Sequence, residues 1–287
     1  MKLAALMLAR NEGHEIGLTA RAALMWADVL IVHNHASTDE TLSILSDLVL
    51  GEERGRVRVL HDPGNTWREA RHRQAMLDEA RRIRATHMAI VDADEILAGP
   101  LLPVIRGAVE SLQPGQILEP HWTCLARSLS RYYTAGVWSS YWVTFAFRDH
   151  AEYRWEAPQG YDHHHRHPFG PRFPVRPWKT PPGLMHLQFV SERRLRAKQF
   201  WYCLTERERW PDRKTPAELS ALYGRAVYES CPRSTPTGEV PREWWEPYRS
   251  IQKHLCMDGP IWQEREIERM LTENPGLADG LTDWRLK

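Results

Sequence analysis

The sequence predicts an α/β fold with a mostly parallel sheet flanked by helices. Three observations support this prediction. Over residues 1–115, short apolar runs of strand length alternate with segments whose apolar residues have helical spacing. Such strand–helix–strand repeats are typical of parallel sheets with helices on both faces. Polar clusters directly follow several of the predicted strands, and 287 residues are enough for one large domain or a domain with an extension.

The elements of this first part follow one another in a regular order. The expected strands and helices are 2–8 (strand), 14–26 (helix), 29–32 (strand), a helix carrying Leu42, Leu45 and Leu48, 57–60 (strand), 67–84 (helix) and 87–91 (strand). Ser37 and Glu40, three residues apart, have the spacing of a capping box and predict the start of the second helix.

The later part of the chain changes character. Residues 116–190 are rich in aromatic residues, His and Pro, with strand-like runs, and residues 157–183 look like a long loop. Helical spacing returns at 192–210, 216–229 and 264–272. We therefore expect a domain over 1–205, with a first half at 1–115 and a second at 116–205, followed by a helical extension at 206–287.

Composition excludes several classes of protein. With 38 basic and 37 acidic residues the net charge is +1, so no overall charge draws the chain to nucleic acid or to anionic membranes. The four cysteines are scattered, which argues against a disulfide scaffold and is typical of a reducing cytoplasm. The apolar start is too short for a signal peptide, and no apolar run approaches the ~20 residues of a membrane span.

Polar residues follow three of the predicted strands, at 10–12, 34–39 and 92–95. The carboxyl ends of parallel strands meet at one edge of a sheet, where ligands bind. Asp92 and Asp94, separated by one residue, could hold a hard divalent cation through oxygen. Helix capping by the same acids is the structural alternative. The metal hypothesis requires both carboxylates to face a space open to an ion, and arginines holding them would count against it.

Three segments carry a resemblance to a known family. Residues 7–12 (MLARNE), 31–41 (IVHNHASTDET) and 89–95 (AIVDADE) resemble, in order and spacing, the family-two glycosyltransferases of the GT-A fold. The resemblance covers residues 3–97. It implies a nucleotide-diphospho-sugar donor, a UDP-sugar by default, with Mn²⁺ or Mg²⁺, and transfer of the sugar to a carbohydrate or another hydroxyl acceptor.

The resemblance also implies roles for individual residues. Asn34 stands where the family usually has an Asp that reads the base, which leaves the base open. Arg71 and Arg73 would meet the diphosphate, which suits the planar donors of guanidinium. Asp92, Asp94 and His186 would hold the metal, since imidazole ligates Mn²⁺ beside carboxylates. The remaining donor contacts are expected from Ala9, Asn11, Glu12, Asp39 and Ala93, with Asp92 also near the ribose.

We expect an inverting transfer, which needs a general base to take the proton of the acceptor hydroxyl; a retaining mechanism is the alternative if no base fits. Three carboxylates in the second half are candidates: Glu156, Asp162 and Asp149, with Glu156 preferred. The run 163–167 (HHHRH) is interpreted as an acceptor loop, because adjacent histidines in an extended chain point in alternate directions and rarely share an ion.

Other functions stay open at this point. A nucleotidyltransferase, another metal-dependent phosphate-transfer enzyme and an inactive nucleotide-sugar-binding module could share the acidic motif. A nucleic acid acceptor is a further alternative because of local Arg clusters among aromatic residues. Release of nucleoside diphosphate that depends on Mn²⁺ and an acceptor would distinguish glycosyl transfer from the others.

Overall fold

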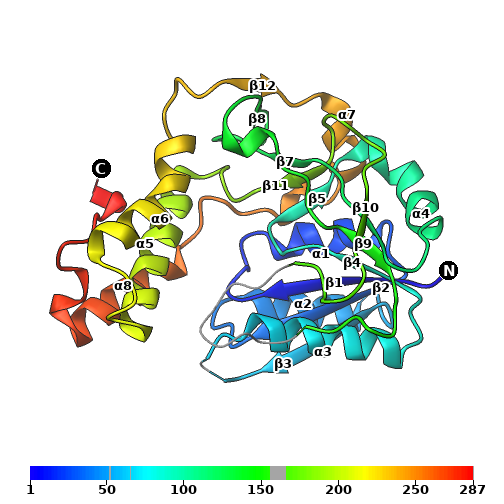
Figure 1. Cartoon of the computed structure of the whole chain (residues 1–287), viewed down its shortest axis with the longest axis horizontal. Helices are drawn as coiled ribbons and strands as arrows, with labels where there is room; N and C mark the ends of the chain where they lie inside the picture. The colour runs from blue at the N-terminus through cyan, green and yellow to red at the C-terminus, as the bar shows by residue number, and fades with distance from the viewer. Residues whose placement is uncertain (52, 65, 156–165, 287) are drawn as a thin grey trace. The chain divides into compact units, whose positions relative to one another are not determined.

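The computed structural model describes residues 1–51, 53–64, 66–155 and 166–286. These residues form two compact units, each assembled from three stretches of chain (Figure 1). Unit 1 comprises Met1–Thr123, Tyr141–His186 and Pro241–Met257, and unit 2 comprises Cys124–Ser140, Leu187–Val240 and Asp258–Lys287. The compact units therefore do not follow the predicted boundary between 205 and 206.

Unit 1 is built on a seven-stranded sheet of order β10-β6-β9-β4-β1-β2-β3. β1 pairs in parallel with β2 and β4, and β2 with β3, while β9 runs antiparallel to β4 and β6. The strands of the sheet are β1 (Leu3–Ala9), β2 (Val29–His35), β3 (Val57–Asp62), β4 (His87–Ile90), β6 (Gln116–Leu118), β9 (Ala146–Arg148) and β10 (Phe173–Val175).

Helices cover both faces of this sheet, because alternate strand residues point to opposite sides. Leu3, Ala5 and Met7 of β1 join one apolar core with α1, α2 and α4, whereas Ala4, Leu6 and Leu8 join another with α3. The helices are α1 (Ile16–Leu24), α2 (Thr41–Leu50), α3 (Glu69–Arg82) and α4 (Leu102–Glu110), and Figure 1 shows them along the strands. The predicted fold class, an α/β fold with a mostly parallel sheet flanked by helices, is confirmed.

A second, small sheet in unit 1 has the order β5-β11-β7. β5 (Glu95–Leu97) and β11 (Leu184–His186) are antiparallel, so that His186 lies opposite Glu95. β7 is Trp122–Cys124, and the short α7 (Arg242–Trp245) lies in the last stretch of this unit. This sheet brings residues from three distant parts of the sequence to the end of β4.

Unit 2 is largely helical, with α5 (Glu192–Arg209), α6 (Pro216–Ser230) and α8 (Trp262–Glu273). β8 (Arg131–Tyr133) pairs with β12 (Thr237–Glu239), and the Tyr133 hydroxyl donates to the carbonyl oxygen of Ser230. These long-range contacts draw residues 124–140 into this unit. No helix in the described stretches has both the length and the apolar character required to span a bilayer.

The capping box predicted at Ser37 and Glu40 is wrong. α2 begins at Thr41, and no side chain caps it at Glu40. The Asp39 carboxylate instead accepts a hydrogen bond from the Thr41 amide at 3.0 Å. Ser37 cannot cap because its hydroxyl is used in a neighbouring loop, where it accepts from the Asn11 amide and donates to Asn34.

Candidate functional site

The loops that follow β1 and β2 are joined by their own polar side chains. The Asn11 amide donates to Ser37 Oγ at 2.9 Å, and Asn11 Oδ1 accepts from the Thr38 amide at 2.6 Å. Ser37 Oγ in turn donates to Asn34 Oδ1 at 2.6 Å. Asn11 has a φ of 57°, a left-handed conformation that Asn tolerates better than most residues. Two of the predicted donor-contact residues, Asn11 and Asn34, are thus brought together.

Asp39 fixes the same two loops at a second point. Its Oδ2 accepts from the Gly13 amide at 2.9 Å, while Oδ1 accepts from the Thr41 amide. The Thr41 hydroxyl also accepts from the amide of Glu12 at 2.8 Å. The carboxylate of Asp39 is therefore engaged within the protein. Ala9 and Ala93, which were also predicted here, are buried at 2% and 3% exposure.

Asp92 lies just beyond the end of β4 and is held by two arginines. Its Oδ1 is 3.3 Å from Nη2 of Arg73, and its Oδ2 is 2.8 Å from Nη1 of Arg166. Arg73 reaches it from α3, where Glu69 also accepts from its Nε at 2.8 Å. Asp92 consequently has the surroundings that count against a role as a simple metal ligand.

Arg166 is the centre of this charge network. Besides Asp92, its guanidinium donates to both oxygens of Glu95, at 2.7 and 2.6 Å, and to the carbonyl oxygens of Ile90 and Thr144. Burial opposes the charged form of Arg166, but the attraction of Asp92 and Glu95 outweighs it, so the pKa of the guanidinium is raised. Glu95 is fully buried and also accepts from Trp122 Nε1 at 2.8 Å.

Asp94 and His186 meet beside this network. They are 92 residues apart in sequence, and His186 Nε2 lies 3.2 Å from Asp94 Oδ2. Trp122 stacks on the His186 ring with centroids 4.4 Å apart, and both Asp94 and His186 are buried. Asp92 does not join them: within the described stretches, Asp92, Asp94 and His186 are not among the groups whose donor atoms all lie within 4.8 Å of one another.

Several predicted residues lie elsewhere. Arg71 is exposed on α3, whereas Arg73, two residues later, is buried at 4%. Asp149 is paired with Arg81 at 2.8 Å. It follows β9, whose antiparallel pairing puts Arg148 opposite His87 at the start of β4, the far end of that strand from Asp92. The structure therefore does not bring Asp149 to the other candidates. Glu156 and Asp162 lie outside the described residues, as do His163, His164 and His165.

Sequence reasoning missed Arg166, Glu95 and Trp122 as members of the site. Glu95 follows the acidic motif directly, so its position was a usable signal. Arg166 lies among four histidines in the run HHHRH. Nothing local in the sequence distinguishes a buried arginine from an exposed one. Trp122 is recognisable only through the β5-β11-β7 sheet, which is a long-range arrangement.

Comparison with known proteins gives distant similarities. No protein-family model and no curated protein matches the chain. The solved structure of S. aureus TarS residues 1–349 in complex with UDP is 15% identical, with a TM-score of 0.37 over 44% of this chain and 36% of that one. Another TarS 1–349 structure is 10% identical, with a TM-score of 0.45 over 96% of this chain and 81% of that one.

Glucosyl-3-phosphoglycerate synthase from Mycobacterium tuberculosis, solved with Mn²⁺, UDP and phosphoglyceric acid, is 19% identical, with a TM-score of 0.30 over 44% of this chain and 43% of that one. The chain thus spans about a third of the UDP-bound TarS chain and less than half of the synthase that it matches.

Proposed function

We propose that the chain transfers a sugar from a nucleotide-diphospho-sugar to a hydroxyl acceptor. The observation that carries the proposal is the meeting of Asp94 and His186 at 3.2 Å, beyond the carboxyl end of β4. In open α/β sheets that edge is where ligands bind. Asn11 follows β1 and Asn34 is the last residue but one of β2, so both belong to the same edge of the sheet.

The Asp94–His186 pair is chemically suited to a divalent ion such as Mn²⁺. One carboxylate oxygen and one imidazole nitrogen, both buried and already within 3.2 Å, are a mixed O,N donor set that this ion accepts. Trp122 stacks on the imidazole and holds its orientation. When bound, the ion would neutralise charge on the diphosphate leaving group. We assign Asp92 to pairing with Arg73 and Arg166 rather than to binding the ion.

Arg73 supports a diphosphate at the same place. It is buried, and its Nη1 has no hydrogen-bond partner among the described residues. A buried guanidinium nitrogen without an acceptor is costly, and a phosphate oxygen would satisfy it. Asp92 and Glu69 hold the rest of the guanidinium in place. Arg71, exposed on the same helix, is a weaker candidate.

The donor base would lie against the loops of Ala9, Asn11, Glu12 and Asn34. Asn34 has both polar atoms engaged, since Oδ1 accepts from Ser37 and Nδ2 lies 3.1 Å from His61 Nδ1. An Asn held in this way offers a different hydrogen-bond pattern from an Asp. We keep a UDP-sugar as the default donor, with Asp39 and Ala93 supporting the pocket.

For the transfer itself we propose inversion, with Glu156 as general base and Asp162 as the alternative. The acceptor oxygen would bond to the anomeric carbon as the bond to the diphosphate breaks, and the carboxylate would take the hydroxyl proton. The described residues on either side of this segment support the proposal. Trp155 packs in the apolar core that contains α3, and Arg166 pairs with Asp92. Asp149, the third candidate, is not proposed as the base, because it is paired with Arg81.

A binding screen tests the proposal. The full chain is heated with UDP, GDP and their sugars, with and without Mn²⁺. A nucleotide at ~100 times its Kd adds about 2.7 kcal/mol, which corresponds to a rise in Tm of roughly 5 °C or more. Asp94→Asn is expected to remove the Mn²⁺-dependent part of this rise and to lower release of nucleoside diphosphate by about 100-fold or more.

Asp78→Asn is the matched control, since Asp78 is an exposed acid on α3 that accepts from Gln74. It should leave both readouts unchanged. If no nucleotide or nucleotide-sugar raises Tm with Mn²⁺ present, or if Asp94→Asn responds like the wild type, the proposed function is refuted.

A further inference from the structure

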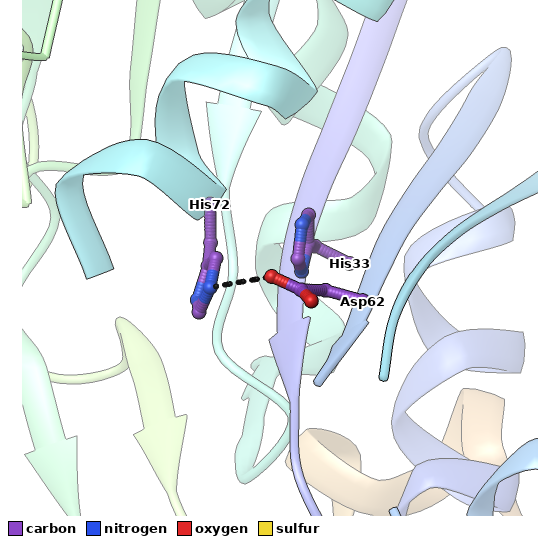
Figure 2. A group of neighbouring side chains, drawn as sticks. All are labelled: His33, Asp62 and His72. Atoms are coloured by element: carbon purple, nitrogen blue, oxygen red, sulfur yellow. Dashed lines mark ion pairs between the residues drawn. The ribbon is translucent and has the colours of Figure 1, made fainter. Parts of the chain in front are cut away.

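A second group of metal-ligand side chains lies away from Asp94 and His186, where β2, β3 and α3 come together. His33 comes from β2, Asp62 from the end of β3 and His72 from α3 (Figure 2). One donor atom of each residue lies within 4.8 Å of a donor atom of both others. The group therefore draws one ligand from each of three different elements of the chain.

Both histidines are buried, at 5% exposure for His33 and 1% for His72. Their rings stack with centroids 4.4 Å apart, and Figure 2 shows the Asp62 carboxylate beside the ring edges. His35 and Trp67 pack around His72, with ring centroids at 4.8 and 5.1 Å. The two histidines are thus enclosed largely by aromatic rings, whereas the side chain of Asp62 is 34% exposed.

Three of the four ring nitrogens of this group lack a normal hydrogen bond. Nδ1 of His33 and Nδ1 of His72 have no hydrogen-bond partner in another described residue. Nε2 of His72 is 3.5 Å from Asp62 Oδ2, which is too long for a good hydrogen bond. Leaving buried polar atoms unsatisfied costs about 1–3 kcal/mol each. If the histidine stack served only packing, its unsatisfied nitrogens would destabilise the fold with no compensating interaction.

We propose that His33, Asp62 and His72 bind a divalent transition-metal ion, at a site separate from Asp94 and His186. Two imidazoles and one carboxylate are a donor set found in zinc and non-haem iron centres. Burial lowers the pKa of His33 to about 4 and that of His72 to about 3, so both rings are neutral, the form that ligates.

Binding an ion requires the donor atoms to move closer and the two stacked rings, whose planes differ by 21°, to turn so that their in-plane lone pairs meet at one point. Ligands at ~2.0–2.1 Å from a tetrahedral ion are about 3.3 Å apart, closer than the 4.8 Å limit within which these donor atoms lie. Asp62, the exposed member, can move towards the rings, and its Oδ1 stays anchored by the Gly64 amide at 2.8 Å. The exposed side of Asp62 is also the path by which an ion and its remaining water ligands would enter.

Zinc titration of the full chain tests the site. Chelator-treated protein is titrated with Zn²⁺ alone by calorimetry in the Asp94→Asn background, so that an ion at Asp94 and His186 cannot contribute. His72→Gln and Asp62→Asn are each expected to lose one equivalent, or to bind it at least ~10-fold more weakly. Co²⁺ added instead should give the visible absorption of a four- or five-coordinate ion, and both variants should lose it.

His87→Gln is the matched control, because His87 is likewise a buried histidine with an unpartnered Nε2, on a different strand. It should keep the full equivalent of Zn²⁺. Asp62→Asn guards against misfolding of the His72 variant, since Asp62 is half-buried and Asn can still accept from Gly64. Equal Zn²⁺ uptake by the Asp94→Asn parent and by the His72→Gln and Asp62→Asn variants made in it, or no uptake by any of the three, overturns the proposal.

Discussion

Arg166 is the one described cation that pairs with both Asp92 and Glu95. Replacing it should therefore lower the stability of the protein. Glu95 is fully buried, so removing its cation leaves a charge in a water-poor site. Breaking such a pair costs about 3–5 kcal/mol. We expect Arg166→Met to lower the free energy of unfolding by this amount in urea denaturation.

Arg82→Met provides the comparison for Arg166→Met. Arg82 pairs with Glu79 on the exposed face of α3, where ion pairs are screened by water and contribute little. Arg82→Met should therefore lower the free energy of unfolding much less than Arg166→Met does. Similar losses in the two variants would mean that the network around Arg166 contributes no more than a surface ion pair.

His87 makes stability depend on pH. Burial, and next the charge of Arg148, lowers the pKa of His87 below its ordinary value of 6.5; the amino terminus acts in the same direction and Glu110 opposes it. Below pH ~6.5 the unfolded chain therefore binds a proton that the folded chain does not, so stability falls as pH falls.

His87→Gln should remove this contribution. Between pH 6.5 and 5, the free energy of unfolding of the wild type should fall more steeply than that of the variant, by at most ~1.4 kcal/mol per pH unit. Denaturant titrations at several pH values measure the two slopes. Parallel slopes would show that His87 is protonated equally in both states.

At the scale of elements, β11 can approach β7 only because residue 183 is glycine. A Cβ there would lie 1.8 Å from the carbonyl oxygen of His121, to which the Leu184 amide donates at 2.9 Å. Gly183→Ala should therefore force the strands apart, cost ~3 kcal/mol or more, and move His186 away from Asp94. Chemical denaturation and Mn²⁺-dependent nucleotide binding measure the two effects.

Gly107→Ala is the matched substitution. Gly107 lies inside α4, and a Cβ there would meet nothing within 4 Å. Alanine is the better helix former, so this variant should gain about 0.5–1 kcal/mol. If Gly183→Ala is tolerated as well as Gly107→Ala, the close approach of β11 and β7 does not determine the position of His186.

Two segments with a capping-box pattern mark how far sequence reasoning reaches. Ser37 and Thr215 are each followed three residues later by Glu, yet only Thr215 forms the reciprocal cap, at the start of α6. Ser37 is engaged by Asn11 and Asn34, from the loop after another strand and from its own strand end. Local spacing predicts helix starts well until a distant residue competes for the same hydroxyl.

In the molecule as a whole, the distance along the sequence between paired elements explains which other predictions could be made. β1 to β4 and their helices are continuous in sequence and strongly periodic, so the parallel part of the sheet was predictable. β9, β10 and β11 have three residues each, and their partners lie far along the chain. For the same reason Asp94 and Arg73 could be named from their strand and helix, whereas Arg166 and Trp122 could not.

Unit 2 depends on the last stretch of the chain. Trp284 is fully buried, donates to the Tyr228 hydroxyl at 3.0 Å and packs against Gly224, where a Cβ would lie 2.7 Å from its ring. A chain shortened after Met257 should therefore become sensitive to protease over residues 187–240, because α5 and α6 lose this cover. Limited proteolysis with mass spectrometry measures it.

The residues of unit 1 are all present in that shortened chain, including Tyr248, whose hydroxyl donates to the Leu97 carbonyl. Residues 1–123 should thus stay as resistant as in the full chain, which makes them an internal control. Unchanged protection of 187–240 would contradict the assignment of residues 258–287 to the same compact unit.

The order of strands in unit 1 also affects the tendency of this chain to aggregate at high concentration. Within the described part of the chain the seven-stranded sheet is open, and β10 and β3 each have a strand neighbour on one side alone. β10 is only three residues long and has Pro174, which lacks an N–H, at its centre, while β3 carries the charged Arg58. Short, proline-bearing or charged borders are poor templates for intermolecular β-pairing, so the sheet is protected from growing into aggregates at either side.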